Sequence, residues 1–317
     1  MGEARRITVE RIEDAAKAIP PVFLNTPQYV CEPLAEVLGA ELTLKVETAN
    51  PIRSFKGRGA CWLVANLVGR EPLLCASAGN FGQAMAWACR AGGVPLTVYA
   101  SVNANPLKLD RMRAMGAEVV LAGDDFDAAK AAAKRVAAER GVRFVEDSRD
   151  PEPTEGAGTI GLELAAAGPF AAVVVPLGNG ALLAGLATAL RARQPTARIV
   201  AVQAVGAAAM TESLQSGRLV VHDRIATIAD GIGVRVPVPE ALADLEGLVD
   251  AFLLVDDETI LAAMRLLFER AGLVAEPSGA VGVAALLAHP ARFAGQRVAT
   301  VACGGNLTPV QARAWLG

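Results

Sequence analysis

Residues 171–190 read "AAVVVPLGNGALLAGLATAL" and carry no charged side chain. A run of about 20 apolar residues is long enough to cross a membrane as a helix. Here, however, Pro176 and the turn 178–180 interrupt the run, with β-branched residues before the interruption and helix formers after it. The stretch therefore predicts a buried strand, a glycine turn and a helix, and it argues against a membrane span.

The same alternation of short apolar segments and helical patterns continues along most of the chain. Repeated strand–helix units predict an α/β protein with open, mostly parallel twisted sheets that are flanked by helices on both faces. The clearest exposed helix is expected over 126–140, ending at Gly141. The segments with a strand pattern are "ELTLKV" (41–46), "LLCA" (73–76), "LTVYA" (96–100), "EVVLA" (118–122), "AAVVV" (171–175), "RIVAV" (198–202), "AFLLV" (251–255) and "RVATVAC" (297–303).

Composition narrows the class of protein. Hydrophobic residues make up 53% of the 317 residues and the formal net charge is −3 without a long basic run, which argues against a nucleic-acid or membrane-surface partner. The five cysteines form no CxxC pair, so reduced thiols are expected and a zinc cluster is not. The N-terminal stretch 1–19 lacks the apolar core of a signal peptide and predicts an amphipathic helix. We therefore expect a cytoplasmic enzyme.

The small number of histidines argues against a catalytic site built on histidine. The chain has only His222 and His289, which we interpret as a surface residue and a helix-end residue. A Ser–His–Asp triad or a histidine metal site would have to use these two alone. Catalysis is expected to depend on another side chain.

Four glycine-containing turns adjoin predicted strands or helices. In parallel sheets, ligands bind beyond the carboxyl ends of strands, where glycine lets backbone N–H groups approach them. The turn at 176–183 suits a phosphate, because the N–H groups of Gly178, Asn179, Gly180, Ala181 and Leu182 and the helix dipole supply a positive field. Each turn alone is a weak signal. The four are "SFKGRGA" (54–60), "SAGNFGQ" (77–83), "PLGNGALL" (176–183) and "CGGN" (303–306).

Taken in order, with "EPSGA" (276–280) before the last turn, these motifs resemble the fold-type II pyridoxal-phosphate enzymes. Within that group the chain is similar to the serine/threonine dehydratase and serine racemase family, over roughly residues 20 to 310. The resemblance implies pyridoxal 5'-phosphate as cofactor and two domains, a small one at 48–147 and a large one from 1–47 and 148–317. A homodimer is also expected.

The resemblance assigns roles to individual residues. Lys56 would be the Schiff-base lysine and the base that takes the α-proton, a use that fits an amine screened from water. Asn80 would bind the phenolic oxygen of the cofactor, and 178–182 its phosphate. Cys303 would face the pyridine nitrogen. The substrate carboxylate would be held by the turn of Ser77, Ala78, Gly79 and Asn80.

Each assignment has a simpler alternative. Lys56 could be a solvated charge, Ser77 could close a turn and Asn80 could cap a helix. Cys303 could be a small buried hydrophobic residue. No role is assigned to Arg53, Arg58 or Glu276, although Glu276 matches a family position near the cofactor ring.

Departures from related families refine the prediction. Gly57 follows the lysine where cysteine synthases have aspartate, which argues against sulfhydryl transfer. A neutral thiol at Cys303 makes the ring a weaker electron sink, which suits β-elimination. Gln203 and Ala209 stand where many members carry acidic ligands, so no divalent metal is expected, although a monovalent ion on backbone carbonyls remains possible. Because the sequence ends at Gly317, we also expect no regulatory domain and no feedback by isoleucine.

The sequence therefore predicts β-elimination of water from a 3-hydroxy amino acid such as L-serine or L-threonine, giving a 2-oxo acid and ammonia. Lys56 would take the α-proton and the cofactor phosphate would protonate the leaving hydroxyl. Alternatives are amino-acid racemisation, elimination from hydroxyaspartate or phenylserine, and binding without turnover. Ala78 argues against racemisation, because serine racemases carry a proton-donating serine there. The sequence does not name the side chain of the substrate.

Overall fold

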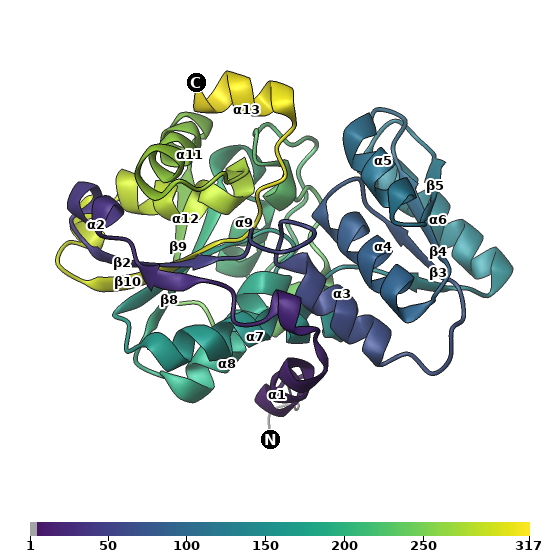
Figure 1. Cartoon of the computed structure of the whole chain (residues 1–317), viewed down its shortest axis with the longest axis horizontal. Coiled ribbons are helices and arrows are strands. Elements are labelled where there is room, and N and C mark those ends of the chain that lie inside the picture. The colour runs from purple at the N-terminus through teal and green to yellow at the C-terminus, as the bar shows by residue number, and fades with distance from the viewer. Residues whose placement is uncertain (1–4) are drawn as a thin grey trace.

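The computed structural model describes residues 5–317 and contains two β-sheets flanked by helices (Figure 1). The stretch 171–190 divides into strand β7 (Ala172–Pro176), a turn and helix α8 (Ala181–Arg193), as predicted. Among the described residues, no helix is long and apolar enough to span a membrane. The expected N-terminal helix is α1 (Val9–Ala18), and residues 1–4 of that prediction lie outside the described part of the chain.

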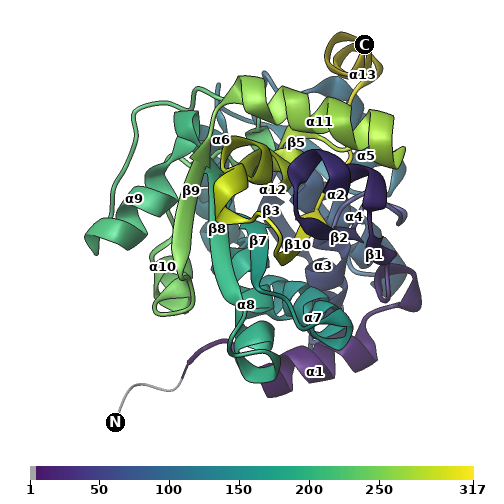
Figure 2. The same ribbon diagram turned by 90° about the vertical axis from the view of Figure 1, so that its left-hand side faces the viewer.

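The larger sheet has the strand order β1-β2-β10-β7-β8-β9, which Figure 2 shows from one side to the other. All neighbouring strands are parallel except β1 and β2, which pair in antiparallel fashion. The strands are β1 (Gln28–Val30), β2 (Glu41–Val46), β10 (Arg297–Ala302), β7 (Ala172–Pro176), β8 (Arg198–Ala204) and β9 (Ala251–Val255).

Helices cover both faces of the larger sheet. Val174 points into one hydrophobic cluster, whereas Val173 and Val175 point into the other. A strand buried on both faces needs apolar residues at every position, which explains the continuous run of β7. The first cluster includes α2 (Glu32–Leu38), α11 (Asp257–Ala271) and α12 (Pro277–Ala288), and the second includes α7 (Pro151–Ala167), α8 and α10 (Pro239–Leu245).

The smaller sheet, β5-β4-β3-β6, is parallel throughout and forms the lobe on the right of Figure 1. Helices α3, α4 and α5 pack on one of its faces and α6 on the other. The predicted helix 126–140 is confirmed, and Gly141 ends it in the left-handed conformation. These elements are β5 (Glu118–Leu121), β4 (Leu96–Ala100), β3 (Leu73–Ala76), β6 (Arg143–Val145), α3 (Lys56–Ala65), α4 (Asn80–Gly92), α5 (Pro106–Ala114) and α6 (Phe126–Arg140).

Helix α3 connects the two lobes because it also packs closely against α7. A Cβ atom at Gly59 would lie 2.5 Å from the Cα of Pro153, and one at Gly156 would lie 2.5 Å from the Cα of Gly59. Only glycine permits this approach of two backbones. The remaining elements are α9 (Ala209–Ser216), α13 (Pro309–Leu316) and the 3-10 turns η1 (Pro21–Phe23), η2 (Val205–Ala207), η3 (Asp230–Ile232) and η4 (Pro290–Arg292).

Candidate active site

Lys56 is the first residue of α3, between the two lobes, and its side chain is only 15% exposed. Its Nζ donates a hydrogen bond to Oδ2 of Asp147 over 2.6 Å and lies 4.6 Å from the centre of the Phe55 ring. This largely covered environment does not match that of a freely solvated lysine. The amine is held beside an aromatic face and a carboxylate, where it can act as a nucleophile or a base.

Asn80 begins helix α4, and the residue that caps this helix is Gly79. The alternative interpretation of Asn80 as the N-cap is therefore wrong. Its Nδ2 instead donates to Oε1 of Glu276 over 2.6 Å, and its Oδ1 accepts from Nδ2 of Asn306 over 2.8 Å. These partners lie 196 and 226 positions from Asn80 in the sequence. The motifs "SAGN", "EPSGA" and "CGGN" therefore come together only through folding.

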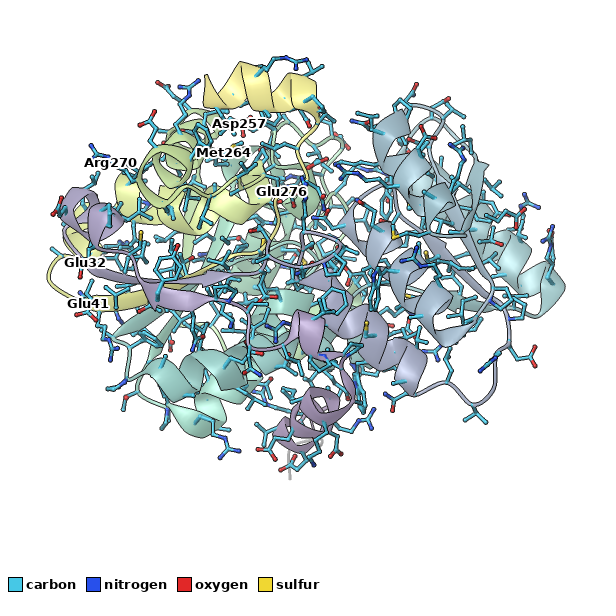
Figure 3. The ribbon with its side chains drawn as sticks, in the orientation of Figure 1. Glu32, Glu41, Asp257, Met264, Arg270 and Glu276 are labelled. Atoms are coloured by element: carbon cyan, nitrogen blue, oxygen red, sulfur yellow. The ribbon has the colours of Figure 1, made fainter. Side chains whose placement is uncertain are left out.

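Glu276 is almost fully buried at the inner edge of the larger lobe (Figure 3). Besides Asn80, its carboxylate accepts from the hydroxyl of Ser278 and the backbone N–H of Asn306, each over 3.0 Å. Burial, and next the charge of Asp230, raise the pKa of Glu276 above its ordinary value. The charge of Lys108 and the hydrogen bonds from Ser278 and Asn80 oppose that rise only in part.

The turn after β3 carries the residues expected to bind the substrate. The hydroxyl of Ser77 accepts from the backbone N–H of Gly79 over 3.2 Å, so Ser77 does close the turn. Ala78, Gly79 and Asn80 remain partly accessible. A Cβ atom at Gly79 would have no neighbouring atom within 4 Å, which leaves open space for a small ligand beside the turn.

The glycine turn after β7 leads directly into α8. Gly180 is the N-cap residue, has φ of +103° and makes no side-chain hydrogen bond to the helix end. The first N–H groups of a helix have no partner within it, and together with the helix dipole they attract an anion. Gly178 and Asn179 are partly accessible, whereas Gly180, Ala181 and Leu182 are buried.

Cys303 follows β10 and is buried. Its thiol donates to the carbonyl of Ser278 over 3.5 Å, and burial raises the pKa of the thiol well above its ordinary value, so it stays neutral. The Cys303 carbonyl accepts from the N–H of Phe55 over 3.1 Å, and Ser54 forms a β-bridge with Gly304. The lysine turn and the "CGGN" turn are therefore adjacent.

Sequence reasoning missed two residues at this site, Asp147 and Asn306. Asn306 lies in a quoted motif, "CGGN", and could have been considered there. Asp147 lies in the charged stretch "VEDSRD" (145–150), which contains none of the motifs used and gives no sign of proximity to Lys56.

The two arginines beside the lysine differ. Arg58 is fully buried and binds the carboxylates of Glu47 and Glu163, so it holds α3 in place. Arg53 is exposed, has φ of +51° and lines a cleft of about 360 Å³ with Arg90 and Arg111.

The remaining candidates lie outside the site. His289 is at the end of α12, and Nε2 of His222 is 2.8 Å from a carboxylate oxygen of Glu212. Gln203 is buried, and its Oε1 accepts from the N–H and the hydroxyl of Thr211. Within residues 5–317, no group of three or more histidine, cysteine, aspartate or glutamate side chains is arranged to hold a metal ion.

Comparisons with known proteins identify the class. A family model described as pyridoxal-phosphate dependent enzyme matches residues 19–304, and the chain belongs to this family. This confirms the predicted cofactor class, and the parallel sheets flanked by helices confirm the predicted α/β fold.

Particular relatives are similar over most of the chain. The L-threonine ammonia-lyase of Thermotoga maritima is 37% identical over 305 residues, covering 95% of this chain and 76% of the relative. The L-threonine dehydratase catabolic TdcB of Staphylococcus aureus (strain N315) is 33% identical over 312 residues, covering 96% and 90%.

Solved structures agree with these matches. The processed form of threonine deaminase isoform 2 from Solanum lycopersicum superposes with a TM-score of 0.89 at 29% identity, covering 98% of this chain and 94% of that one. Maize serine racemase superposes with a TM-score of 0.89 at 26% identity, covering 97% and 96%. The predicted resemblance is therefore confirmed.

The residues present fit the cofactor of this family. The partly accessible amine of Lys56, the uncapped start of α8 and the open space at Gly79 offer a site for an aldehyde, a phosphate and a small ligand. The neutral thiol of Cys303 is compatible with an unprotonated ring nitrogen.

Proposed function

We propose that this chain catalyses β-elimination of water from a 3-hydroxy amino acid such as L-threonine or L-serine, giving a 2-oxo acid and ammonia. The observation that carries the proposal is a covered lysine amine between two lobes, with an uncapped helix start and an open glycine turn. Relatives named threonine ammonia-lyase and threonine dehydratase support the same reaction class.

Pyridoxal phosphate, when bound, supplies the electron sink that loss of the α-proton requires. We assign phosphate binding to the backbone of Gly178 to Leu182 and contact with the phenolic oxygen to Asn80. Cys303 would face the pyridine nitrogen of the bound cofactor and would offer it no strong proton donor. The amine of Lys56 would hold the cofactor aldehyde and would then take the α-proton of the substrate.

The substrate is assigned to the turn after β3. The backbone N–H of Ala78, with the hydroxyl of Ser77, offers donors to a carboxylate. Ser77 already accepts a bond from Gly79, and its own hydroxyl proton remains free to donate. The space beside Gly79 suits a small amino acid.

A neutral group beside the pyridine nitrogen favours elimination over reactions that pass through a long-lived carbanion. When the β-substituent departs, it carries the electron pair away, so the demand on the ring is brief. Cys303 is buried and its raised pKa keeps it neutral.

Racemisation is the second candidate, because the fold closely resembles that of maize serine racemase. A racemase needs a proton donor on each face of the α-carbon, and Lys56 serves one face. The methyl group of Ala78 has no proton to donate on the other face of the α-carbon. Elimination is therefore the favoured reaction.

Three further expectations complete the proposal. We assign 48–147 to a small domain and 1–47 with 148–317 to a large one, in keeping with the composition of the two sheets. We also propose a homodimer and a cytoplasmic location.

The experiment compares three proteins after saturation with pyridoxal phosphate. The unmodified chain should show visible absorption of lysine-linked cofactor that borohydride bleaches, and it should release a 2-oxo acid from at least one isomer of serine, threonine, hydroxyaspartate or phenylserine. Lys56→Ala should lose both signals, whereas Lys17→Ala, at an exposed lysine, should keep them. Turnover by Lys56→Ala, or no linked cofactor in the unmodified chain, would refute the proposal.

A further inference from the structure

Asp147 contacts the reacting amine of the site and is not otherwise engaged. Its Oδ2 accepts the 2.6 Å hydrogen bond from Nζ of Lys56, and both side chains are 15% exposed. Its other oxygen, Oδ1, is buried and has no hydrogen-bond partner within residues 5–317. A bare carboxylate oxygen beside an amine is costly to keep, since buried acceptors are normally bonded.

The segment that carries Asp147 is firmly positioned. It joins β6 to α7, and the next residue, Ser148, has φ of +68°, a conformation that costs a serine free energy and persists only where surrounding contacts impose it. The guanidinium of Arg6 donates to the carbonyls of Ser148 and Arg149. The carboxylate of Asp150 accepts from the N–H of Glu146 over 2.7 Å.

This arrangement differs from a structural ion pair. Arg58, for comparison, is fully buried and forms two-pronged bonds to both Glu47 and Glu163, so its donors are matched. Within the described residues, the carboxylate of Asp147 makes one hydrogen bond, through Oδ2, and its Oδ1 makes none. The carboxylates of Glu47 and Glu163 use both oxygens, whereas Oδ1 of Asp147 is available to a further partner.

We propose that Asp147 is a second acid–base residue of the active site, which exchanges a proton with Lys56 and delivers it to the leaving group of the substrate. The transfer of a proton from Asp147 to the leaving group rests on the proposed elimination reaction. The contact between Asp147 and the amine of Lys56 does not depend on that reaction. It also replaces the cofactor phosphate as the source of the proton that the hydroxyl takes.

The proton balance is complete without another reactant. The α C–H bond breaks, its proton passes to Nζ of Lys56, and its electron pair becomes the second bond between Cα and Cβ. The Cβ–O bond breaks and its pair stays on oxygen. Lys56 passes the proton to Oδ2 of Asp147, and Oδ1 or Oδ2 gives it to that oxygen, which leaves as water.

The same carboxylate should slow attachment of the cofactor to the free protein. Covalent linkage to an aldehyde requires the lone pair of the amine, and Nζ of Lys56 must leave its 2.6 Å ion pair with Oδ2 of Asp147 before it can attack. Removing the negative charge should therefore speed linkage and slow turnover. These opposite effects distinguish an acid–base group from a residue that merely supports the fold.

The test uses cofactor-free Asp147→Asn, with Asp124→Asn as a control at an exposed aspartate. At neutral pH, the visible absorption of lysine-linked cofactor should develop about tenfold faster in Asp147→Asn after pyridoxal phosphate is added. Its release of 2-oxo acid, once loaded, should be about 100-fold slower. The control should match the unmodified chain in both measurements.

A second variant covers the case in which asparagine distorts the loop. Asp147→Ala should be equally impaired in turnover, and added formate should restore part of the activity by supplying a carboxylate. Slower linkage together with slower turnover, or no response to formate, would overturn the assignment. If no 3-hydroxy amino acid is a substrate of the unmodified chain, the proposed elimination reaction is wrong. An unchanged rate of cofactor linkage in Asp147→Asn would separately refute an effect of Asp147 on the amine of Lys56.

Discussion

Ala78 lies in the turn between β3 and α4, partly accessible, with its methyl group packed against the hydrophobic cluster of the smaller lobe. It is adjacent to the open space at Gly79. A methyl group neither donates nor accepts a proton, so under the proposed function this position would supply no second proton donor for racemisation.

We expect Ala78→Ser to gain measurable racemisation of an L-substrate while elimination continues, because the new hydroxyl can return a proton to the α-carbon. Chiral chromatography of the remaining amino acid measures this. Ala104→Ser, which alters a partly buried alanine at the same cluster, should gain none. Rapid formation of the D-enantiomer by the unmodified chain would show that another residue supplies the second proton.

Among single residues, those that lie in short motifs could be predicted from the sequence, whereas those that depend on distant contacts could not. Lys56 and Asn80 lie in recognisable turns. The contact between Lys56 and Asp147 joins positions 91 residues apart, and no local pattern encodes it. The N-cap alternative for Asn80 was wrong because Gly79, with no side chain to offer, takes the cap position.

Helix α8 is the element on which the assignment of the phosphate depends. We expect Gly180→Asp to weaken cofactor binding by tenfold or more, since one lost charge-assisted contact is worth roughly 1.5–3 kcal/mol before any repulsion is counted. Equilibrium titration with pyridoxal phosphate measures this.

Gly180→Ala is the matched control, because it introduces the same Cβ at a φ of +103° without the charge. That Cβ would lie 3.2 Å from Cδ1 of Leu245, so alanine should lower thermal stability as well. The difference in affinity between the two variants isolates the carboxylate. Equal affinities would place the phosphate elsewhere.

Among elements, the interior strands and the edge strands β5 and β9 were predictable, whereas the short edge strands β1 and β6 were not. Strands such as β7 and β10 are buried on both faces, so their apolar runs are unmistakable. Strands β1 and β6 have three residues each, and their partly exposed side chains leave little pattern. Their pairing is decided by the neighbouring strand.

Across the whole molecule, a buried ionic network joins the larger sheet to α3 and α7. Arg58 of α3 binds Glu47, which follows β2, and Glu163 of α7, which also pairs with Lys45 of β2. Burial acts to lower the pKa of Arg58, but the two carboxylates raise it above its ordinary value. Burial acts to raise the pKa of Glu163, yet Arg58 and Lys45 hold it below its ordinary value.

A carboxyl whose pKa is lowered by folding stabilises the protein above its unfolded pKa, here 4.5, and that contribution is lost as the pH falls from there through the folded pKa. We expect Glu163→Gln to reduce the free energy of unfolding by about 3 kcal/mol at neutral pH. The deficit should shrink as the pH falls below 4.5.

Urea unfolding of both proteins across this range measures the effect, with Glu36→Gln as a control at an exposed position of α2. A deficit that is independent of pH would mean that the glutamine disturbs packing and that the charge of Glu163 contributes little.

The order of strands in the two sheets also bears on how the chain is made. Strands β3 to β6 are contiguous in sequence, so the smaller sheet has all its strands once residue 145 has left the ribosome. Strand β2, in contrast, lies between β1 and β10, and its partner at 297–302 is synthesised long after it. Until then, one edge of β2 lacks its partner strand, and we expect a nascent chain of this kind to be prone to aggregation.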